Sequence, residues 1–555
     1  MSRERLIYMP LGGAGEIGMN AYVYGYGAPG AERLILVDLG VTFPEMDGTP
    51  GVDLIMPDMS WLIERRDRLE AVFITHAHED HVGGLAHFAH ALGAPVHARA
   101  FTANIARGKL AEYGLEPEIV QVSGPWPQMI SAGPFSAAFL PVSHSIPESA
   151  GLVIDSPAGR VVHSGDFKID PTPIVGEAFD PALWAEVARG GVRALVCDST
   201  NVFSPEPGRS EAGLATGIEA LVAGAGGMVI ATTFASNVAR LKTLAEAGSR
   251  AGRSIVLFGR AMRRMIEAAV ETGVLTEFPP TISAEEALEL PRDQVMLLAT
   301  GSQGERRAAS AQLARGKYRG ITLEEGDLFL FSSRTIPGNE RDVIRIMNGL
   351  SEKGVEVVDD DSGRYHVSGH ANRPDLERVH QIVQPGIVIP MHGEHRHLRE
   401  HMKIAEAGGF AAALAVNGTM LELGEGGAKT VDYVETGRSY LDGSVLIGAL
   451  DGVVRDRIRM ALNGHVTLTL ILDERDAMLG DPWCETMGLA DAGISRKPLV
   501  EVLEAEIARQ VARADRKILA DDDALRDMLQ RHLRQKAQSE IGKKPEVTVV
   551  VSRMR

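Results

Sequence analysis

Residues 75–84, with the sequence THAHEDHVGG, place three histidines and two acidic residues within six positions, directly after an apolar stretch. His76 and His78 alternate with Ala77, so an extended segment would point both imidazoles the same way. Imidazole nitrogen and carboxylate oxygen are ready zinc ligands, and catalytic zinc sites leave a position open for water. A solvated turn, the alternative, rarely gathers so many ligand-type side chains. We interpret the cluster as part of a metal-dependent hydrolytic site.

Short apolar, β-branched runs elsewhere in the chain also end in polar residues, and each run is typical of a buried strand. These terminal residues, in chain order, are Asp38, His76, His144, Asp166, Asp198 and His392. Ligands of α/β sheets bind outside the carboxyl ends of strands, so we expect these endings to share one edge. With His78, Asp80 and His81 added, the edge supplies enough imidazoles and carboxylates for two metal ions, if one carboxylate bridges them.

Residues 13–18, GAGEIG, match the dinucleotide-binding pattern G-x-G-x-x-G. That pattern binds pyrophosphate only where a helix begins within it, because the helix N-terminus holds the anion. The following residues, MNAYVYGYG, alternate like a strand instead. We therefore expect a tight turn near the metal site and no nucleotide cofactor.

The chain has 555 residues, of which 45% are hydrophobic and 24% charged, as in a soluble protein of several domains. Its net charge of −17 argues against broad nonspecific nucleic-acid binding, although a local basic groove remains compatible with it. Residues 1–13 lack the apolar core of a signal peptide, and no apolar run approaches membrane-spanning length. We expect a cytoplasmic protein with no membrane partner. Only Cys197 and Cys484 occur, which excludes a disulfide framework and a thiolate metal site.

The order of strand-like and helix-like segments predicts an α/β protein with an insertion. Residues 1–203 and 347–435 share one style, while residues 204–346 read as a separate α/β layer of strand–helix units. Residues 436–452 are polar and contain glycine, so we expect a linker there. Residues 453–555 form a smaller α+β unit, with one long amphipathic helix from about Lys497 to Gln538 and a closing strand. Its basic cluster could touch RNA, line a dimer surface or serve solubility alone.

Several motifs together resemble the nucleases of the metallo-β-lactamase superfamily. THAHEDHVGG, with Asp38, His144 and SGDF at residues 164–167, is similar to the hydrolase motifs of that fold. The insertion, together with DSTN before it and HVSGHA and MHGE after it, resembles the β-CASP group. Within it, GGAGEIGMN, FASN, GSQGE, PGNE and HVSGHANR are similar to the bacterial ribonuclease J family. The resemblance implies a metallo-β-lactamase αββα sandwich with an inserted β-CASP domain and a small C-terminal domain for oligomerisation.

The resemblance also implies roles for individual residues. One zinc ion would be held by His76, His78 and His144, and the other by Asp80, His81 and His392, with Asp166 as the bridge. Asp38 would orient a ligand histidine. His370, supported by Asp198, would be the general acid, and Asp80 would also belong to the catalytic set. Substrate would be bound by His366, Val367, Ser368, Gly369, His370, Ser236 and Asn237, although the last two also read as a helix N-cap.

The activity implied is zinc-dependent hydrolysis of single-stranded RNA in rRNA maturation and mRNA decay. It would combine 5′-to-3′ exonuclease action, favouring a 5′-monophosphate, with endonuclease cuts. The cofactors implied are two Zn²⁺ ions, with Mg²⁺ or Mn²⁺ as supporting ions. The partners implied are single-stranded RNA, a second or further copies in a homodimer or homotetramer, and members of an RNA-decay complex. The alternatives are an endonuclease only, a DNA-processing β-CASP enzyme, or a small-molecule hydrolase on the same core. His392 argues against the DNA enzyme, and the long insertion argues against a small substrate.

Overall fold

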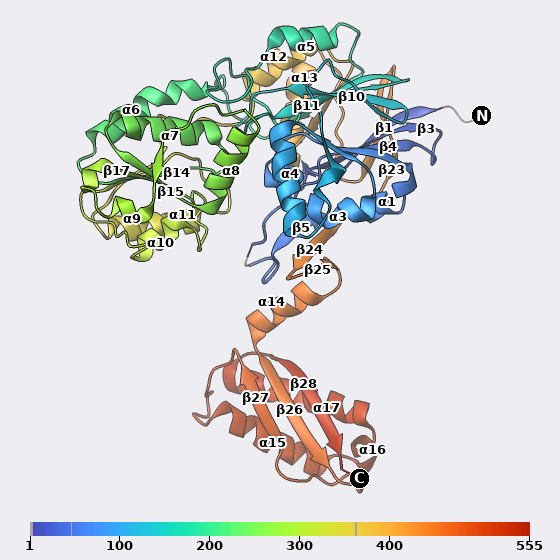
Figure 1. The fold of residues 1–555 in the computed structure, drawn as a ribbon. Helices are drawn as coiled ribbons and strands as arrows, with labels where there is room; N and C mark the ends of the chain where they lie inside the picture. Colours follow the sequence, from blue (N-terminus) through green and yellow to red (C-terminus); the bar gives the residue numbers. More distant parts are fainter. Residues whose placement is uncertain (1–3, 46, 361–362, 555) are drawn as a thin grey trace. The chain divides into compact units, whose positions relative to one another are not determined.

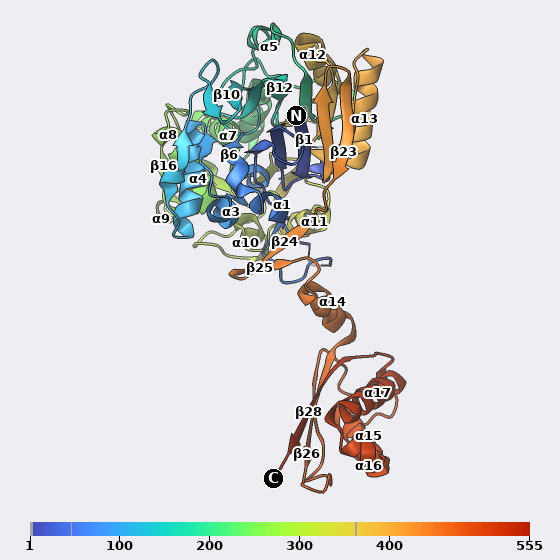
Figure 2. The ribbon, with the colours of Figure 1, turned by 90° about the vertical axis from the view of Figure 1, so that its right-hand side faces the viewer.

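The computed structural model describes residues 4–45, 47–360 and 363–554. The chain divides into two compact units, residues 1–42 with 56–438, and residues 43–55 with 439–555. Figures 1 and 2 show the elements of both units along the chain. Among the described helices, none combines the length and the apolar character needed to cross a bilayer.

Two sheets that face each other form the core of the first unit. The eight-stranded sheet has the order β23 (Gly427–Tyr433), β22 (Thr419–Gly424), β1 (Arg5–Gly12), β3 (Ala21–Gly27), β4 (Arg33–Val37), β6 (Leu69–Ile74), β7 (Val96–Ala98) and β8 (Val120–Val122). The six-stranded sheet has the order β20 (Val388–Met391), β13 (Ala194–Asp198), β12 (Gly159–His163), β11 (Ala150–Ser156), β10 (Phe135–Pro141) and β9 (Ile130–Ala132). One buried apolar cluster, with Phe73 from the first sheet and Phe139 from the second, fills the space between them.

Helices cover the outer faces of the two sheets. α4 (Ala100–Glu112) packs on β7 and β8, next to α3 (Leu85–Leu92). On the six-stranded sheet lie α5 (Pro181–Ala188), α12 (Arg373–Val383) and α13 (His395–Ala407), whose Trp184, Val379 and Ile404 join a second apolar cluster. The layer order is therefore helix, sheet, sheet, helix. The expected αββα sandwich is confirmed.

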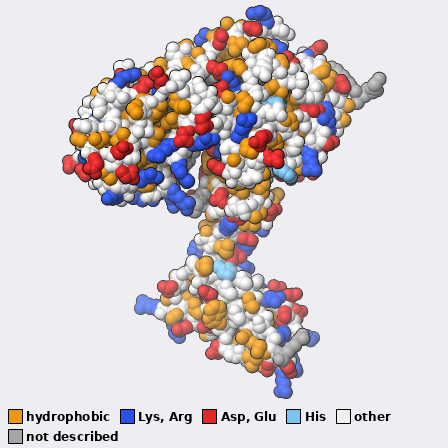
Figure 3. Space-filling view, in the orientation of Figure 1, with side chains coloured by type: hydrophobic (Ala, Val, Ile, Leu, Met, Phe, Trp, Pro, Cys, Tyr) orange, Lys and Arg blue, Asp and Glu red, His pale blue; other side chains and the backbone are white. Residues whose placement is uncertain are grey.

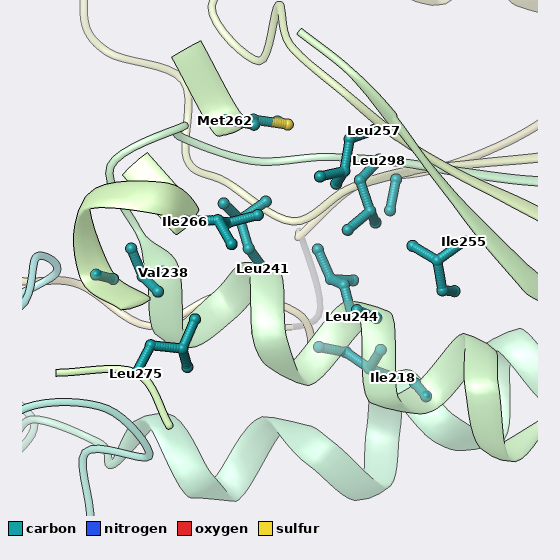
Figure 4. Packing of buried hydrophobic residues seen from close by; sticks show 14 of the residues in the cluster. Ile218, Val238, Leu241, Leu244, Ile255, Leu257, Met262, Ile266, Leu275 and Leu298 are labelled. Carbon is teal, nitrogen blue, oxygen red and sulfur yellow. The ribbon is translucent and has the colours of Figure 1, made fainter. Parts of the chain in front are cut away.

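A third sheet, inserted between β13 and β20, is parallel throughout. Its order is β16 (Thr281–Ile282), β15 (Ser254–Phe258), β17 (Val295–Ala299), β14 (Val229–Thr232), β18 (Leu328–Phe331) and β19 (Glu356–Val358). One face is covered by α6 (Ala215–Gly224), α7 (Val238–Arg250) and α8 (Arg260–Glu271), and the other by α9 (Ala284–Ala287), α10 (Ala309–Arg315) and α11 (Glu340–Ser351). In Figure 4, Leu241 and Leu244 of α7 point at Leu257 and Leu298 of the strands. Residues from β14 to β19, with their helices, are called the inserted domain below.

The second unit has a three-stranded sheet, β27 (Trp483–Met487), β26 (His465–Leu472) and β28 (Glu546–Arg553), with helices packed on one face. The single long helix expected from Lys497 to Gln538 is wrong. The chain forms α15 (Leu499–Arg513), α16 (Arg516–Leu519) and α17 (Asp522–Ile541). Asp515 and Asp521 break the run because their carboxylates accept hydrogen bonds from the first amides of the next helix.

The stretch expected to be a linker contains two strands, β24 (Arg438–Asp442) and β25 (Val445–Gly448). They pair as a hairpin whose turn contains Gly443, with a φ of 64°. Asp442 pairs with Val445, so the turn consists of Gly443 and Ser444, and a two-residue turn with glycine first is a hairpin signal that explains why a polar stretch is ordered here. The C-terminal part of the second unit begins at Ser439 and continues through α14 (Val453–Asn463).

Candidate metal centre

The expected edge exists: the polar residues that follow the strands of both core sheets come together. His76 follows β6, His144 follows β10, Asp166 follows β12 and His392 follows β20, while Asp198 is the last residue of β13. Their ligand atoms fall into overlapping groups in which all atoms lie within 4.8 Å of one another. The two core sheets thus contribute metal-ligand atoms to a single site between them.

Three ring nitrogens form the first group. Nδ1 of His78 lies 3.1 Å from Nε2 of His76 and 3.2 Å from Nε2 of His144. Oδ2 of Asp166 lies 3.9 Å from both Nε2 atoms. A neutral imidazole has one N–H and one lone pair, so three nitrogens aimed at a common point fit a cation better than one another.

The second group adjoins the first through Asp166. Oδ2 of Asp166 is 3.2 Å from Nε2 of His81, which in turn is 3.5 Å from Oδ2 of Asp80. Nε2 of His392 lies 3.2 Å from the same Asp80 oxygen. The donor set, imidazoles with two carboxylates, fits a pair of divalent cations that share Asp166.

The outer nitrogen of each of the five histidines has its own partner. The pairs are His76 Nδ1 with Thr75 Oγ1 at 3.0 Å, His78 Nε2 with Ser236 Oγ at 3.1 Å, His81 Nδ1 with Asp38 Oδ2 at 2.8 Å, His144 Nδ1 with the Gly369 carbonyl at 2.6 Å, and His392 Nδ1 with Thr200 Oγ1 at 2.7 Å. A carbonyl or carboxylate only accepts, so His144 and His81 must donate from Nδ1. Their Nε2 atoms then keep the lone pair for a metal.

Burial and neighbouring charges divide the histidines into two kinds. Burial lowers the pKa of His76 and His144 well below its usual value and that of His78 to about 4, so these rings are neutral. Burial also opposes the charge on His392, but Asp166 and the other carboxylates prevail and raise its pKa to about 10. A ligand histidine must be deprotonated, so a cation at the second group competes with a proton that these carboxylates attract.

The loops that carry the ligands are joined by backbone hydrogen bonds. Asn20 N donates to the Asp80 carbonyl at 3.0 Å and Leu39 N to the His81 carbonyl at 2.8 Å. Gly40 makes this approach possible, since a Cβ atom there would lie 1.6 Å from the Asp80 carbonyl oxygen. The GGAGEIGMN stretch takes part through Asn20 and continues into β3, as expected, without a helix.

His370 stands beside both groups. Its Nδ1 is 2.8 Å from Oδ2 of Asp198, whose Oδ1 accepts hydrogen bonds from the amide and hydroxyl of Thr200. Burial opposes the charged ring, but Asp198 and Asp166 outweigh burial and raise the pKa of His370. The ring can therefore carry a proton on Nε2, which Asp198 does not use.

The residues expected to bind substrate are placed in different ways. Ser236 reaches His78, whereas Asn237 is only 4% exposed and caps α7 by accepting from Arg240 N at 2.9 Å. In the 366–370 segment, Val367 is buried in an apolar cluster and Ser368 Oγ accepts from His370 N at 3.1 Å.

Three residues of the site went unnoticed in the sequence. Thr75 donates to Asp38 and contacts His76, and Thr200 links Asp198 to His392. Asn20 Nδ2 lies 3.0 Å from Nε2 of His81. The available signal was their position in the sequence, because Thr75 directly precedes His76, Thr200 lies in the DSTN motif and Asn20 lies at the end of the glycine-rich turn.

A separate buried group consists of Cys197 on β13, His380 on α12 and His401 on α13. Nε2 of His380 and Nε2 of His401 are 3.1 Å apart, and Nδ1 of His401 is 2.9 Å from Ser199 Oγ. Burial raises the pKa of the Cys197 thiol above its usual range, so the sulfur is protonated. These side chains satisfy one another as a polar spot in the core.

Comparison with known proteins agrees with this geometry. Residues 15–194 match the metallo-beta-lactamase superfamily, residues 226–350 the ribonuclease J beta-CASP domain, residues 363–414 the Zn-dependent metallo-hydrolase RNA specificity domain, and residues 452–554 the ribonuclease J C-terminal domain. A solved structure from Enterococcus faecalis V583, of a protein of unknown function, has a TM-score of 0.52 and 17% identity, covering 76% of this chain and all of that one. It supports the fold alone.

Curated relatives extend the match over almost the whole chain. The protein named Ribonuclease J from Sinorhizobium meliloti is 40% identical over 99% of this chain and 98% of its own length. Those from Corynebacterium glutamicum and Mycolicibacterium smegmatis are each 36% identical, over 87% and 90% of this chain and 67% and 89% of their own lengths. The chain belongs to the ribonuclease J family and is a metal-dependent hydrolytic ribonuclease.

Proposed function

We propose that this ribonuclease uses two zinc ions to hydrolyse single-stranded RNA from the 5′ end, favours a 5′-monophosphate, and also makes internal cuts. We place it in the cytoplasm, in rRNA maturation and mRNA decay. The observation that carries the two-metal part is the set of five histidines, each held by an outer partner, around the shared Asp166. Two such cations lower the pKa of water and polarise phosphoryl oxygens, and Mg²⁺ or Mn²⁺ could support the same chemistry.

His370 supplies the proton in this scheme. A phosphodiester bond breaks faster when its leaving 3′ oxygen is protonated, and a histidine does this near neutral pH. Asp198 holds Nδ1, so Nε2 is the atom that gives the proton to the leaving oxygen. The negative charge of Asp198 also keeps the ring protonated until substrate arrives.

Basic side chains near His370 form a positively charged environment that suits a terminal phosphate. Burial, followed by the charges of Arg240, Arg334, Lys168 and Arg209, lowers the pKa of His366 to about 3. In Figure 3, further basic side chains gather where the inserted domain adjoins the core, and there Arg264 donates to Asn104 of α4 at 2.8 Å. An anchored 5′ end would place the first linkage at the metals, which is the basis of an exonuclease mode.

The test uses purified protein on body-labelled single-stranded RNA with either a 5′-monophosphate or a 5′-triphosphate, with His76→Ala as control. We expect mononucleotides to accumulate progressively, faster from the monophosphate, and no products from the variant. Internal fragments alone, formed equally fast from both RNAs, would show that the enzyme is an endonuclease without a 5′ pocket.

We also place self-association on the second unit. The face of its sheet away from the helices exposes Ile471, Trp483, Met487 and Val550. Exposed apolar side chains clustered on one face are typical of an interface, and two-fold symmetry is the default for identical copies.

Trp483→Ser should lower the molar mass measured by light scattering after size exclusion, from dimer or tetramer toward monomer. Tyr433→Ser, which removes an exposed aromatic ring from the first unit, should leave that mass unchanged.

A further inference from the structure

The two metal groups differ in which part of the chain holds their histidines. In the second group, His81 is held by Asp38 and His392 by Thr200, and these partners follow the core strands β4 and β13. In the first group, His78 is held by Ser236, which lies between β14 and α7 of the inserted domain.

His144, also of the first group, depends on the segment by which the chain returns from the inserted domain. Its Nδ1 donates to the carbonyl of Gly369 at 2.6 Å. The fit is close, since a Cβ atom on residue 369 would lie 2.9 Å from Cε1 of His144 and 2.6 Å from Ser145 Oγ. The position of this segment therefore sets the ring plane of His144.

Apolar packing joins the same ligands to the inserted domain. Ala77, between His76 and His78, is buried in one cluster with Val238 and Leu241 of α7. Val367, two residues before Gly369, belongs to it as well. Figure 4 shows Val238 and Leu241 of α7 within this cluster. Closely packed interiors transmit displacements, so α7 cannot move without moving the residue between two ligands.

A buried arginine fixes α7 to the returning segment. Arg240 is fully buried, forms a two-pronged ion pair with Glu211, and donates from Nη1 to the carbonyls of Ser332 at 2.8 Å and Tyr365 at 3.1 Å. Two of the three outer contacts of the first group, Ser236 before α7 and Gly369 after Tyr365, are thus parts of one braced assembly, while the third, Thr75 on His76, belongs to the core.

We propose that the inserted domain determines the metal affinity of the first group, with Ser236 and Gly369 as positioning residues for His78 and His144. The second group is independent of it. This inference rests on the proposed two-metal centre. The family resemblance implies that Ser236 binds substrate, whereas here Ser236 orients the metal ligand His78. Movement of the inserted domain would then change occupancy of one site and leave the other as it is.

The experiment measures zinc affinity directly on the full-length protein, by competition with a chromogenic chelator, for Ser236→Ala, Ser236→Thr and Ser249→Ala. Removal of an outer partner of a ligand histidine typically costs about 10- to 100-fold in metal affinity. For Ser236→Ala we expect this loss of zinc affinity at one of the two sites, with the affinity of the other site unchanged. Ser236→Thr keeps a hydroxyl and should recover the affinity of the first site. Ser249→Ala, at the exposed far end of α7, should bind both ions normally. Circular dichroism confirms that each variant is folded.

The outcomes separate this inference from the proposed function. If Ser236→Ala binds both ions as the parent does and only KM for RNA rises, Ser236 binds substrate and the inference is overturned. If both ions are lost together, the groups are not independent and the inference also fails. A parent protein that binds a single ion contradicts the two-metal proposal itself.

Discussion

At the scale of single residues, Asp38 shows how little freedom a ligand's partner has. Its Oδ1 accepts from the amide and hydroxyl of Thr75 at 2.8 and 3.0 Å, and its Oδ2 accepts from His81 Nδ1 at 2.8 Å. Both oxygens face donors, so the site accepts a carboxylate and has no place for an N–H group. Because Asp38 is fully buried, no water can relieve a mismatch.

The substitution Asp38→Asn tests this requirement. Its amide nitrogen must face either Thr75 N–H or His81 Nδ1–H, so one hydrogen bond is lost or His81 shifts its proton to Nε2. We expect about 10- to 100-fold weaker zinc binding at the second group, with a matching loss of RNA hydrolysis at limiting zinc. Metal titration and a hydrolysis assay check it, with Asp67→Asn, an exposed position, as control. Unchanged zinc affinity would show that Asp38 does not orient His81.

The ligand histidines could be predicted from spacing because chemistry and position coincide in THAHEDHVGG. Of their outer partners, Asp38 was assigned this role in advance, but the hydroxyl partners could not be, because a hydroxyl carries no signature of its target. Ser236 is 158 residues from His78 and Thr200 is 192 residues from His392. Only the meeting of two sheets and the inserted domain brings these pairs together.

At the scale of elements, strands were predictable and helix breaks were not. Six core strands, β4, β6, β10, β12, β13 and β20, have apolar runs that lead into the polar residues of the site, and this pattern survives in the structure. The stretch from Leu499 to Ile541 keeps an apolar stripe across its breaks, with Leu503, Ile507, Leu525 and Leu529 in one core cluster. Hydrophobic periodicity alone therefore predicts one long helix where the chain forms three. The N-caps Asp515 and Asp521 determine where the second and third helices begin.

The cap at Asp521 gives a measurable prediction. Its carboxylate accepts hydrogen bonds from the amides of Asp523 and Ala524 at 3.0 and 3.2 Å, at the start of α17. Asp521→Ala should lower the free energy of unfolding of the second unit by about 1 kcal/mol. Urea unfolding followed by circular dichroism measures it. Asp527→Ala, an exposed acid within α17, should change the stability much less, and equal losses in both variants would mean that capping contributes nothing special.

At the scale of the whole molecule, the chain has two compact units, and only one of them contains the metal ligands. The apolar cluster of the second unit draws on residues 466–549, and the metal ligands all belong to the first unit. Ion binding to a folded state stabilises that state by mass action, about 2.7 kcal/mol when the free metal is at 100 times its Kd. That stabilisation should act on the first unit alone.

Chelation separates the two cores experimentally. In scanning calorimetry of the full chain we expect two transitions, of which EDTA lowers one and leaves the other in place. The reason is that stripping the ions removes the binding free energy that favours the folded first unit, whereas the second unit has no ligand in its described residues. In the variant His392→Ala the EDTA-sensitive transition should begin lower and shift less. A single transition that the chelator shifts as a whole would show that the two units unfold as one cooperative body, and that the metals stabilise the chain as a whole.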